Sequence, residues 1–324
     1  MRVLVIGATG AIGAPLVRQL IDRGHEVTGT YHSPGGAERV RAMGARPAQL
    51  DALDARAVRE VVLAAEPDAV VHQATALTGL RSLRNVDRVF ARTNLLRTAG
   101  TDALLAAARE AGVRRFVAQG NTTMYARVGG PVKTEDDPLD TDPPRPARES
   151  AAAMRHLEAS VLGAGGIVLR YGTFYGAGDD GLVEPVRRRW FPIVGDGGGI
   201  VSWIHLDDGA AATVLALEHG MPGVYNVVDD DPAPVREWLP ALAEVLGAPP
   251  PRRVPRWLAR VLAGEFVVNL STQVRGASNA KAKRELGWTL RHPTWREGFA
   301  EAYGQGGAGA VAREARPAAP APAR

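Results

Sequence analysis

Three glycines at three-residue spacing, Gly7, Gly10 and Gly13, stand near the start of the chain. They follow the apolar run 3–6 and precede a helical pattern over residues 14–23. A strand, a glycine-rich turn and a helix in this order are typical of a dinucleotide-binding unit. Gly7 permits a tight turn, Gly10 lets a pyrophosphate approach the backbone, and Gly13 lets the helix pack closely on the strand. The alternative, a turn that binds nothing, is disfavoured by the flanking strand and helix.

The residues after the second expected strand, 26–30, bear on the choice between NAD and NADP. An Asp or Glu at this point would accept hydrogen bonds from a ribose 2′-hydroxyl and would repel a 2′-phosphate. This chain has Tyr31, His32 and Ser33 there instead, with Arg39 close by in sequence. His32 and Arg39 therefore favour NADP(H) over NAD(H), and ordinary loop residues are the alternative.

The elements that must position these residues alternate between strands and helices. Apolar runs at 69–73, 115–119 and 166–171 are each preceded by a helical stretch. This alternation predicts an α/β fold whose parallel sheet is covered on both faces. We expect a dinucleotide-binding Rossmann-type domain over residues 1–180. A smaller substrate lobe over 181–303 is partly interleaved with it.

The composition excludes several classes of protein. The chain has 324 residues, a net charge of +4 and no cysteine, so disulfides, thiol catalysis and cysteine-ligated metals are excluded. We expect no metal, no nucleic-acid partner and no membrane span, and a cytoplasmic location. Residues 304–324 are rich in Gly, Ala and Pro, which predicts a disordered tail.

Several motifs along the chain resemble those of the extended short-chain dehydrogenase/reductases, the NAD-dependent epimerase/dehydratase family. They are Gly7-Ala-Thr-Gly-Ala-Ile-Gly13, Asp51 with Asp54, His72-Gln-Ala74, Asn94, Leu169-Arg-Tyr-Gly-Thr-Phe-Tyr-Gly176, Pro192-Ile-Val-Gly-Asp-Gly197, Trp203-Ile-His-Leu-Asp-Asp208 and Arg284-Glu-Leu-Gly-Trp288. The resemblance covers about residues 1–303. It implies a doubly wound parallel sheet in the order 3-2-1-4-5-6-7 and a smaller C-terminal substrate lobe.

The cofactor site can be outlined from the glycine loop and these motifs together. Asp51 follows the third expected strand, where an adenine amino group binds, and Tyr171 and Phe174 are expected to pack near the nicotinamide. The full set of expected cofactor-binding residues is Gly7, Thr9, Gly10, Ile12, Gly13, His32, Arg39, Asp51, Ala74, Tyr171 and Phe174.

The catalytic pair that the resemblance implies is missing. The family uses a Tyr and a Lys four residues apart on a helix, where the Lys cation lowers the Tyr pKa and the Tyr moves a proton. The lysines of this chain are Lys133, Lys281 and Lys283, and none has a Tyr four residues before it. Alignment by the helix that ends near residue 158 places Ser150 at the Tyr position and Met154 at the Lys position.

Other residues are therefore candidates for the chemistry. Alignment places Asn121 at the family's Ser/Thr position, so Thr122 and Thr123 are the hydroxyl donors beside it. Tyr125 can donate a proton to a substrate oxygen, and Arg155 can replace the missing cation. The candidate catalytic residues are Tyr125, Thr122, Thr123, Ser150 and Arg155. Packing of Tyr125 and solvent exposure of Arg155 are the alternatives.

The sequence leaves the reaction open. An oxidoreductase or epimerase acting on a small organic or secondary-metabolite substrate is the leading hypothesis. The residues before Trp203 lack the arginine that sugar-nucleotide enzymes commonly place there. A dinucleotide-binding regulator without catalysis, and a non-redox isomerase or cyclase, are the alternatives. The helices around residues 94–111 and 150–162 would allow a homodimer.

Overall fold

The core of the protein is a seven-stranded parallel sheet in the order β12-β7-β5-β4-β1-β2-β3. The computed structural model describes residues 1–77, 84–176 and 181–304. The strands are β1 Arg2–Ile6, β2 Glu26–Tyr31, β3 Arg46–Gln49, β4 Ala69–His72, β5 Arg115–Asn121, β7 Ile167–Tyr171 and β12 Gly223–Val227. The expected Rossmann-type fold and its strand order are therefore confirmed, with β7 and β12 as the sixth and seventh strands.

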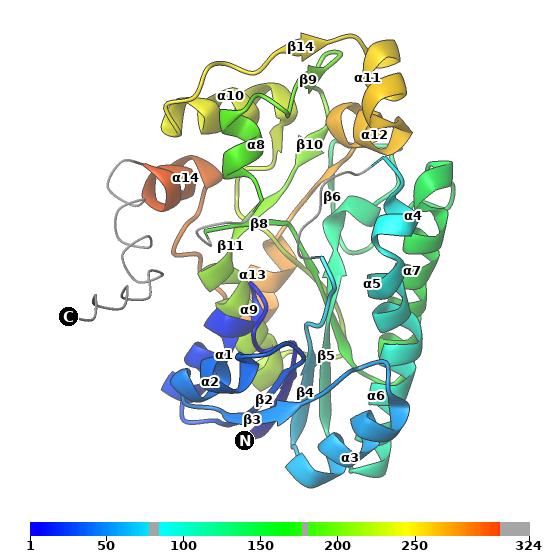
Figure 1. Ribbon diagram of the computed structural model, residues 1–324, viewed down its shortest axis with the longest axis vertical. Helices are drawn as coiled ribbons and strands as arrows, with labels where there is room; N and C mark the ends of the chain where they lie inside the picture. The colour runs from blue at the N-terminus through cyan, green and yellow to red at the C-terminus, as the bar shows by residue number, and fades with distance from the viewer. Residues whose placement is uncertain (78–83, 177–180, 305–324) are drawn as a thin grey trace, which may run out of the picture.

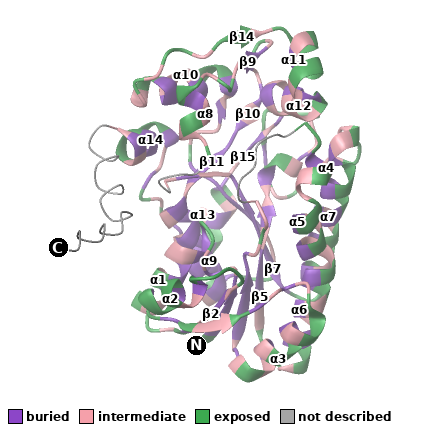
Figure 2. Cartoon of the chain, viewed as in Figure 1, coloured by how far each residue is buried: buried purple, intermediate pink, exposed green. Residues whose placement is uncertain are grey.

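Helices cover both faces of the sheet, because its strands are apolar on both sides (Figures 1 and 2). One face is covered by α1 Gly13–Asp22, α2 Gly36–Ala42, α9 Leu206–His219 and α13 Ala280–Leu286. The other is covered by α3 Ala55–Ala65, α6 Thr101–Glu110 and α7 Arg148–Gly163. No helix in the described parts of the chain is long and apolar enough to cross a membrane.

The stretch 86–111 is divided into four helical pieces. They are α4 Val86–Val89, α5 Ala91–Leu95, a π-helical turn Leu96–Gly100, and α6. Asn85 caps α4 by accepting a hydrogen bond from the N–H of Arg88. A π-helical turn inserts one extra residue and is often found at functional sites. The division therefore changes which side chains of this stretch face α7.

The rest of the chain forms a second group of elements above the carboxyl edge of the sheet (Figure 1). Its helices are α8 Val183–Arg187, α10 Val235–Val245, α11 Arg256–Ala263, α12 Glu265–Thr272 and α14 Trp295–Tyr303. Its short strands pair as β6 Val132–Lys133 with β15 Gly276–Ala277, β8 Thr173–Tyr175 with β11 Trp203–His205, β9 Ile193–Val194 with β14 Arg253–Val254, and β10 Ile200–Val201 with β13 Ala233–Pro234. A separate core that includes Trp203, Trp295 and Phe299 stabilises this group.

The division of the chain at residue 181 stays a prediction. Helices α9 and α13 and strand β12 come from beyond residue 181, yet they pack on or extend the central sheet. The predicted disordered tail, 304–324, lies outside the described residues except for Gly304.

Candidate cofactor and substrate site

The glycine loop has the geometry that a bound dinucleotide requires. Gly7 has a φ of +88°, and a Cβ there would lie 3.0 Å from the Cα of Ala74. A Cβ on Gly13 would lie 2.2 Å from the carbonyl oxygen of Gly7, so α1 can approach β1 this closely only with glycine. A Cβ on Gly10 would meet only the Gly7 carbonyl, at 3.3 Å, and would otherwise point into open space. The loop therefore packs tightly inward and leaves its backbone open outward, where a pyrophosphate would lie.

The remaining apolar residues of the expected cofactor site gather beside this loop. A Cβ on Gly209 of α9 would lie 3.2 Å from Ile12 and 3.5 Å from Phe174, so these two side chains face the same point. The ring of Tyr171 lies 5.1 Å from that of Phe174. Thr9 is half-buried within the loop. The structure thus brings together residues from the glycine loop, β7, β8 and α9.

Tyr171 is held by its hydroxyl inside the protein. The hydroxyl accepts a hydrogen bond from Gln73 at 3.0 Å and shares another with Thr213 at 2.6 Å. Burial raises the pKa of Tyr171 to about 12. Tyr171 is therefore a packing residue beneath Phe174 and has no free polar group to offer a ligand.

The polar residues expected at the adenosine end lie at the carboxyl ends of β2 and β3. His32 and Arg39 are exposed, and the Arg39 guanidinium donates to the Ser33 hydroxyl at 3.2 Å. Asp51 forms an ion pair with Arg92 at 3.0 Å. Burial raises the pKa of Asp51, but hydrogen bonds from the Leu53 N–H and from Arg92 outweigh this and lower it. This edge of the sheet therefore has two exposed basic side chains, His32 and Arg39, and one carboxylate, Asp51, that is paired with Arg92.

The residues that follow β5 divide between buried and exposed positions. Thr122 is buried, and its hydroxyl donates to the carbonyl oxygen of Tyr171 at 3.2 Å. Thr123 is exposed, and its N–H is bound by the Asn121 side chain at 2.7 Å. Of this pair, Thr123 has the side chain that a ligand can reach.

Tyr125 lies in a buried polar network. Its hydroxyl donates to Asn226 at 2.7 Å and accepts from Arg170 at 2.9 Å. Arg170 also forms a two-pronged ion pair with Glu158 of α7, at 2.9 and 2.7 Å. Burial raises the pKa of Tyr125, although the charge of Arg170 works against this. The structure thus holds the Tyr125 hydroxyl between two protein groups.

The start of α7 carries Ser150 and Met154, which the sequence alignment places at the family's Tyr and Lys positions. The Ser150 hydroxyl donates to Asp87 at 2.8 Å and accepts from Asn94 at 3.0 Å. Met154 is buried. Arg155 donates to the carbonyl oxygen of Asp140 at 3.0 Å and is thereby held away from Ser150.

Asp87 is a residue of this site that the sequence did not indicate. It precedes Ser150 by 63 residues and belongs to no motif. Its carboxylate also accepts hydrogen bonds from the backbone N–H groups of Glu149 and Ser150, at 3.1 and 2.8 Å. A carboxylate at the first amides of a helix is a common cap, but here it comes from a distant segment.

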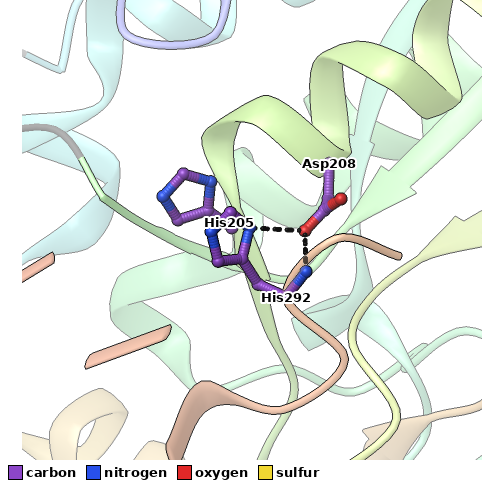
Figure 3. Close-up of side chains that lie close together, drawn as sticks. All are labelled: His205, Asp208 and His292. Atoms are coloured by element: carbon purple, nitrogen blue, oxygen red, sulfur yellow. Dashed lines mark hydrogen bonds and ion pairs between the residues drawn. The ribbon is translucent and has the colours of Figure 1, made fainter. Parts of the chain in front are cut away.

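A second polar cluster lies where α9 begins (Figure 3). His205, Asp208 and His292 each bring one side-chain N or O atom to within 4.8 Å of the others. Asp208 accepts from the His292 ring and backbone, both at 2.9 Å, and from the Arg291 N–H at 2.7 Å. The two imidazoles stack at 3.8 Å, and the Nδ1 of His205 accepts from the Asp207 N–H. These bonds fasten the loop before α14 to the first turn of α9.

Comparison with known proteins places the chain among reductases, epimerases and dehydratases. It is 44% identical over 307 residues to the "3-diazoavenalumate denitrifying reductase" of a Streptomyces species, which covers 92% of this chain and 99% of that protein. It is 33% identical over 256 residues to the "4-hydroxy-2-methyl-3-oxo-4-farnesyl-3,4-dihydroquinoline-1-oxide ketoreductase" of Stigmatella aurantiaca, covering 76% and 74%.

A similar solved structure is the UDP-glucose 4-epimerase of Thermus thermophilus in complex with NAD. Its TM-score is 0.71 at 28% identity, and the match covers 94% of this chain and 98% of that one. The model of the NAD dependent epimerase/dehydratase family matches residues 3–227, the part that carries the glycine loop and the central sheet. The chain belongs to the NAD dependent epimerase/dehydratase family.

Proposed function

We propose that this protein is an NAD(P)H-dependent reductase that replaces the diazonium group of a small aromatic substrate with hydrogen. One observation carries the proposal: a cofactor loop with all three glycines stands beside an acid–base position that has Ser150 and Met154 in place of Tyr and Lys. The 44% identity to a denitrifying reductase of a diazo compound supports the same chemistry.

The reaction explains why no proton donor is needed. Carbonyl reduction leaves an alkoxide that must be protonated, whereas loss of dinitrogen from an arenediazonium leaves a neutral arene. Reduced nicotinamide, when bound, supplies a hydride: a C–H bond forms at the ring carbon, the C–N bond breaks, its electron pair leaves with N₂, and the cofactor ends as NAD(P)⁺. No proton is consumed.

The chain's own residues then bind and orient. Gly7, Gly10 and Gly13 with Ala74 receive the pyrophosphate, and Ile12 and Phe174 form the apolar wall beside the nicotinamide. Thr9, His32, Arg39 and Asp51 are the other residues that we propose contact the cofactor. Tyr171 packs beneath the site.

We propose NADP(H) as the preferred cofactor. His32 follows β2 and Arg39 lies on the next helix, α2, and both are exposed where a 2′-phosphate would lie. Among the described residues, the Arg39 guanidinium is bound only to the neutral hydroxyl of Ser33. A guanidinium suits a phosphate because it offers several donors in one plane.

Substrate contact falls to Thr123 in this proposal. Thr123 is exposed after β5, and Ser150 stands at the start of α7, which follows β5 in the chain and so begins at the same carboxyl edge of the sheet. Ser150, Tyr125, Thr122 and Arg155 are positioning residues, because each of their polar groups is bound to another part of the protein.

Reduction of a carbonyl is the second candidate function. It is favoured by the 33% identity to a ketoreductase. It requires a proton donor that the positions 150 and 154 do not supply, so Thr123 or a water molecule would have to provide the proton. A product that keeps its oxygen distinguishes this reaction from loss of N₂.

The test uses reduced cofactor that carries deuterium at C4 of the nicotinamide. The purified protein is incubated with this cofactor and 4-hydroxybenzenediazonium, and both cofactor oxidation and the isotope content of the phenol are measured. We expect deuterium on the carbon that bore nitrogen, formed faster than in an enzyme-free control; a rate equal to that control would reject the reaction. Cofactor binding without turnover of diazonium or carbonyl compounds would instead support a regulator, and product formation without cofactor oxidation would support an isomerase.

We further propose a homodimer through α6 and α7 and a cytoplasmic location. Leu95 and Leu162 are 53% and 37% exposed on this side of the protein, which an interface between two copies would cover. Sedimentation of the wild-type protein and of a Leu95→Glu variant tests the dimer, because a charge at this position would disfavour association.

A further inference from the structure

The start of α7 has the opposite charge from the one that the family's catalytic pair would give it. A Tyr–Lys pair places a cation beside the substrate, where it favours a developing oxyanion. Here Met154 is neutral and buried, and the nearest group bound to the Ser150 hydroxyl is the carboxylate of Asp87, at 2.8 Å. The site has therefore exchanged a positive charge for a negative one.

Among the described residues, no cationic side chain bonds directly to the Asp87 carboxylate. Within residues 84–176 and the other described parts of the chain, the hydrogen bonds that its carboxylate accepts come from the Glu149 N–H, the Ser150 N–H and the Ser150 hydroxyl. All three donors are uncharged. A half-buried carboxylate bound only by neutral donors still attracts a cation nearby.

Ser150, which is 7% exposed, lies between Asp87 and Asn94. Because its proton is directed to Asp87, the Ser150 oxygen is left as an acceptor. It already accepts from the amide of Asn94, whose own Oδ1 is buried and without a partner among the described residues. Two oxygen acceptors and a carboxylate thus stand together where the family places a donor and a cation.

We propose that Asp87, acting through Ser150, selects a positively charged substrate at this site. The proposal rests on the proposed function and deepens it, since an arenediazonium carries one positive charge on the group that leaves. Asp87 is a specificity-determining residue. Its carboxylate favours binding of the cation and takes no part in bond making.

The test measures binding separately from turnover. N-methylpyridinium and toluene have nearly the same shape and differ by one positive charge, and neither is a substrate for hydride replacement. Each is titrated calorimetrically into protein saturated with NADPH. We expect Asp87→Asn to weaken N-methylpyridinium binding about tenfold and to change toluene binding less than about twofold. A structural role alone would weaken both probes alike.

A matched control is Asp102→Asn. Asp102 accepts from Ser160 and His156 further along α7, away from the sheet's carboxyl edge, so this variant should leave both affinities unchanged. If Asp87→Asn does not fold, Ser150→Ala takes its place in the titrations, because this variant keeps the backbone hydrogen bonds to Asp87. The preference of the wild-type protein for the cation is itself a test. Equal binding of the two probes to the wild-type protein would overturn the proposal.

The two proposals fail in distinguishable ways. Turnover of 4-hydroxybenzenediazonium with no loss of charge preference in Asp87→Asn would leave the reductase and remove the role of Asp87. A charge preference without diazonium turnover would keep the cation site and reject the reaction.

Discussion

The two halves of the site differ in how far they keep the family's pattern. The cofactor half, on β1 and α1, has all three glycines, and the packing around Gly7 and Gly13 admits no other residue. The proposed substrate half, on β5 and α7, has Ser150 and Met154 where the sequence alignment places the acid–base pair. Under the proposed function, the difference teaches that delivery of a hydride and delivery of a proton are separable parts of this fold.

The largest effect is expected at the cofactor half, from Gly10→Ala. The new methyl group would meet only the Gly7 carbonyl inside the protein, so the fold should persist while the space for the pyrophosphate is filled. We expect NADPH affinity to fall about a hundredfold, measured by reduced-nicotinamide fluorescence, with little change in melting temperature. Gly163→Ala at the end of α7 is the control, because a methyl group there has nothing within 4 Å. Unchanged NADPH affinity in Gly10→Ala would refute the assignment of the loop.

A substitution at Tyr125 tests whether the substrate half retains an acid. Tyr125→Phe removes the donor to Asn226 and one acceptor of Arg170, so we expect a loss of about 2 kcal/mol in the free energy of unfolding. The rate of cofactor oxidation should change less than about twofold if Tyr125 is a positioning residue. A large fall in the rate of cofactor oxidation with unchanged stability would show that Tyr125 takes part in the reaction.

Arg39→Ala tests whether this side chain recognises the 2′-phosphate of NADPH. Removing this exposed guanidinium should weaken NADPH binding about tenfold and leave NADH binding unchanged. Arg41→Ala, on the same helix α2 and paired with Glu38, is the control. An equal loss for the two cofactors would mean that Arg39 does not contact a 2′-phosphate.

A pH profile separates activity from stability. Without an acid–base pair, the rate should vary little between about pH 6 and 9. Stability should vary, because Asp229 is buried with its Oδ2 unpartnered in the described structure, and burial raises its pKa from 3.8 to about 8. The folded protein then holds the proton more tightly than the unfolded chain does. The contribution of Asp229 to stability is therefore fully present below pH 3.8 and is lost as the pH rises through about 8.

Asp229→Asn should remove this dependence. We expect a gain of about 5 kcal/mol in the free energy of unfolding near pH 8.5 that largely disappears near pH 4, measured by urea denaturation. Asp22→Asn, at an exposed carboxylate on α1, should produce neither change. A constant difference between Asp229→Asn and the wild type at both pH values would show that Asp229 is not protonated in the folded protein.

The fold was predictable from the sequence because its signals are local. The glycine turn and most of the sheet are specified by residues close together in the chain. Strand β12, with a glycine and an asparagine among its five residues, gave no clear strand pattern of its own. A seventh strand at this edge of the sheet was predicted only from the family resemblance.

The substrate half was less predictable because its contacts are distant in sequence. The Tyr125 hydroxyl is bound by Asn226, 101 residues away, and Ser150 by Asp87, 63 residues away. The sequence predicted that Ser150 stands at the family's Tyr position, but not that it bonds to the carboxylate of Asp87. The direction of the Arg155 side chain, toward the Asp140 carbonyl, was equally hidden.

The ion pair between Glu158 and Arg170 has a consequence for how such a protein changes its reaction. It fixes the rotation and height of α7 from a buried position on β7, one and two helical turns below Met154 and Ser150. The residues at these two positions are therefore not needed to hold the helix. Because the ion pair lies outside these two positions, the chemistry they supply can differ while the backbone of α7 stays where it is.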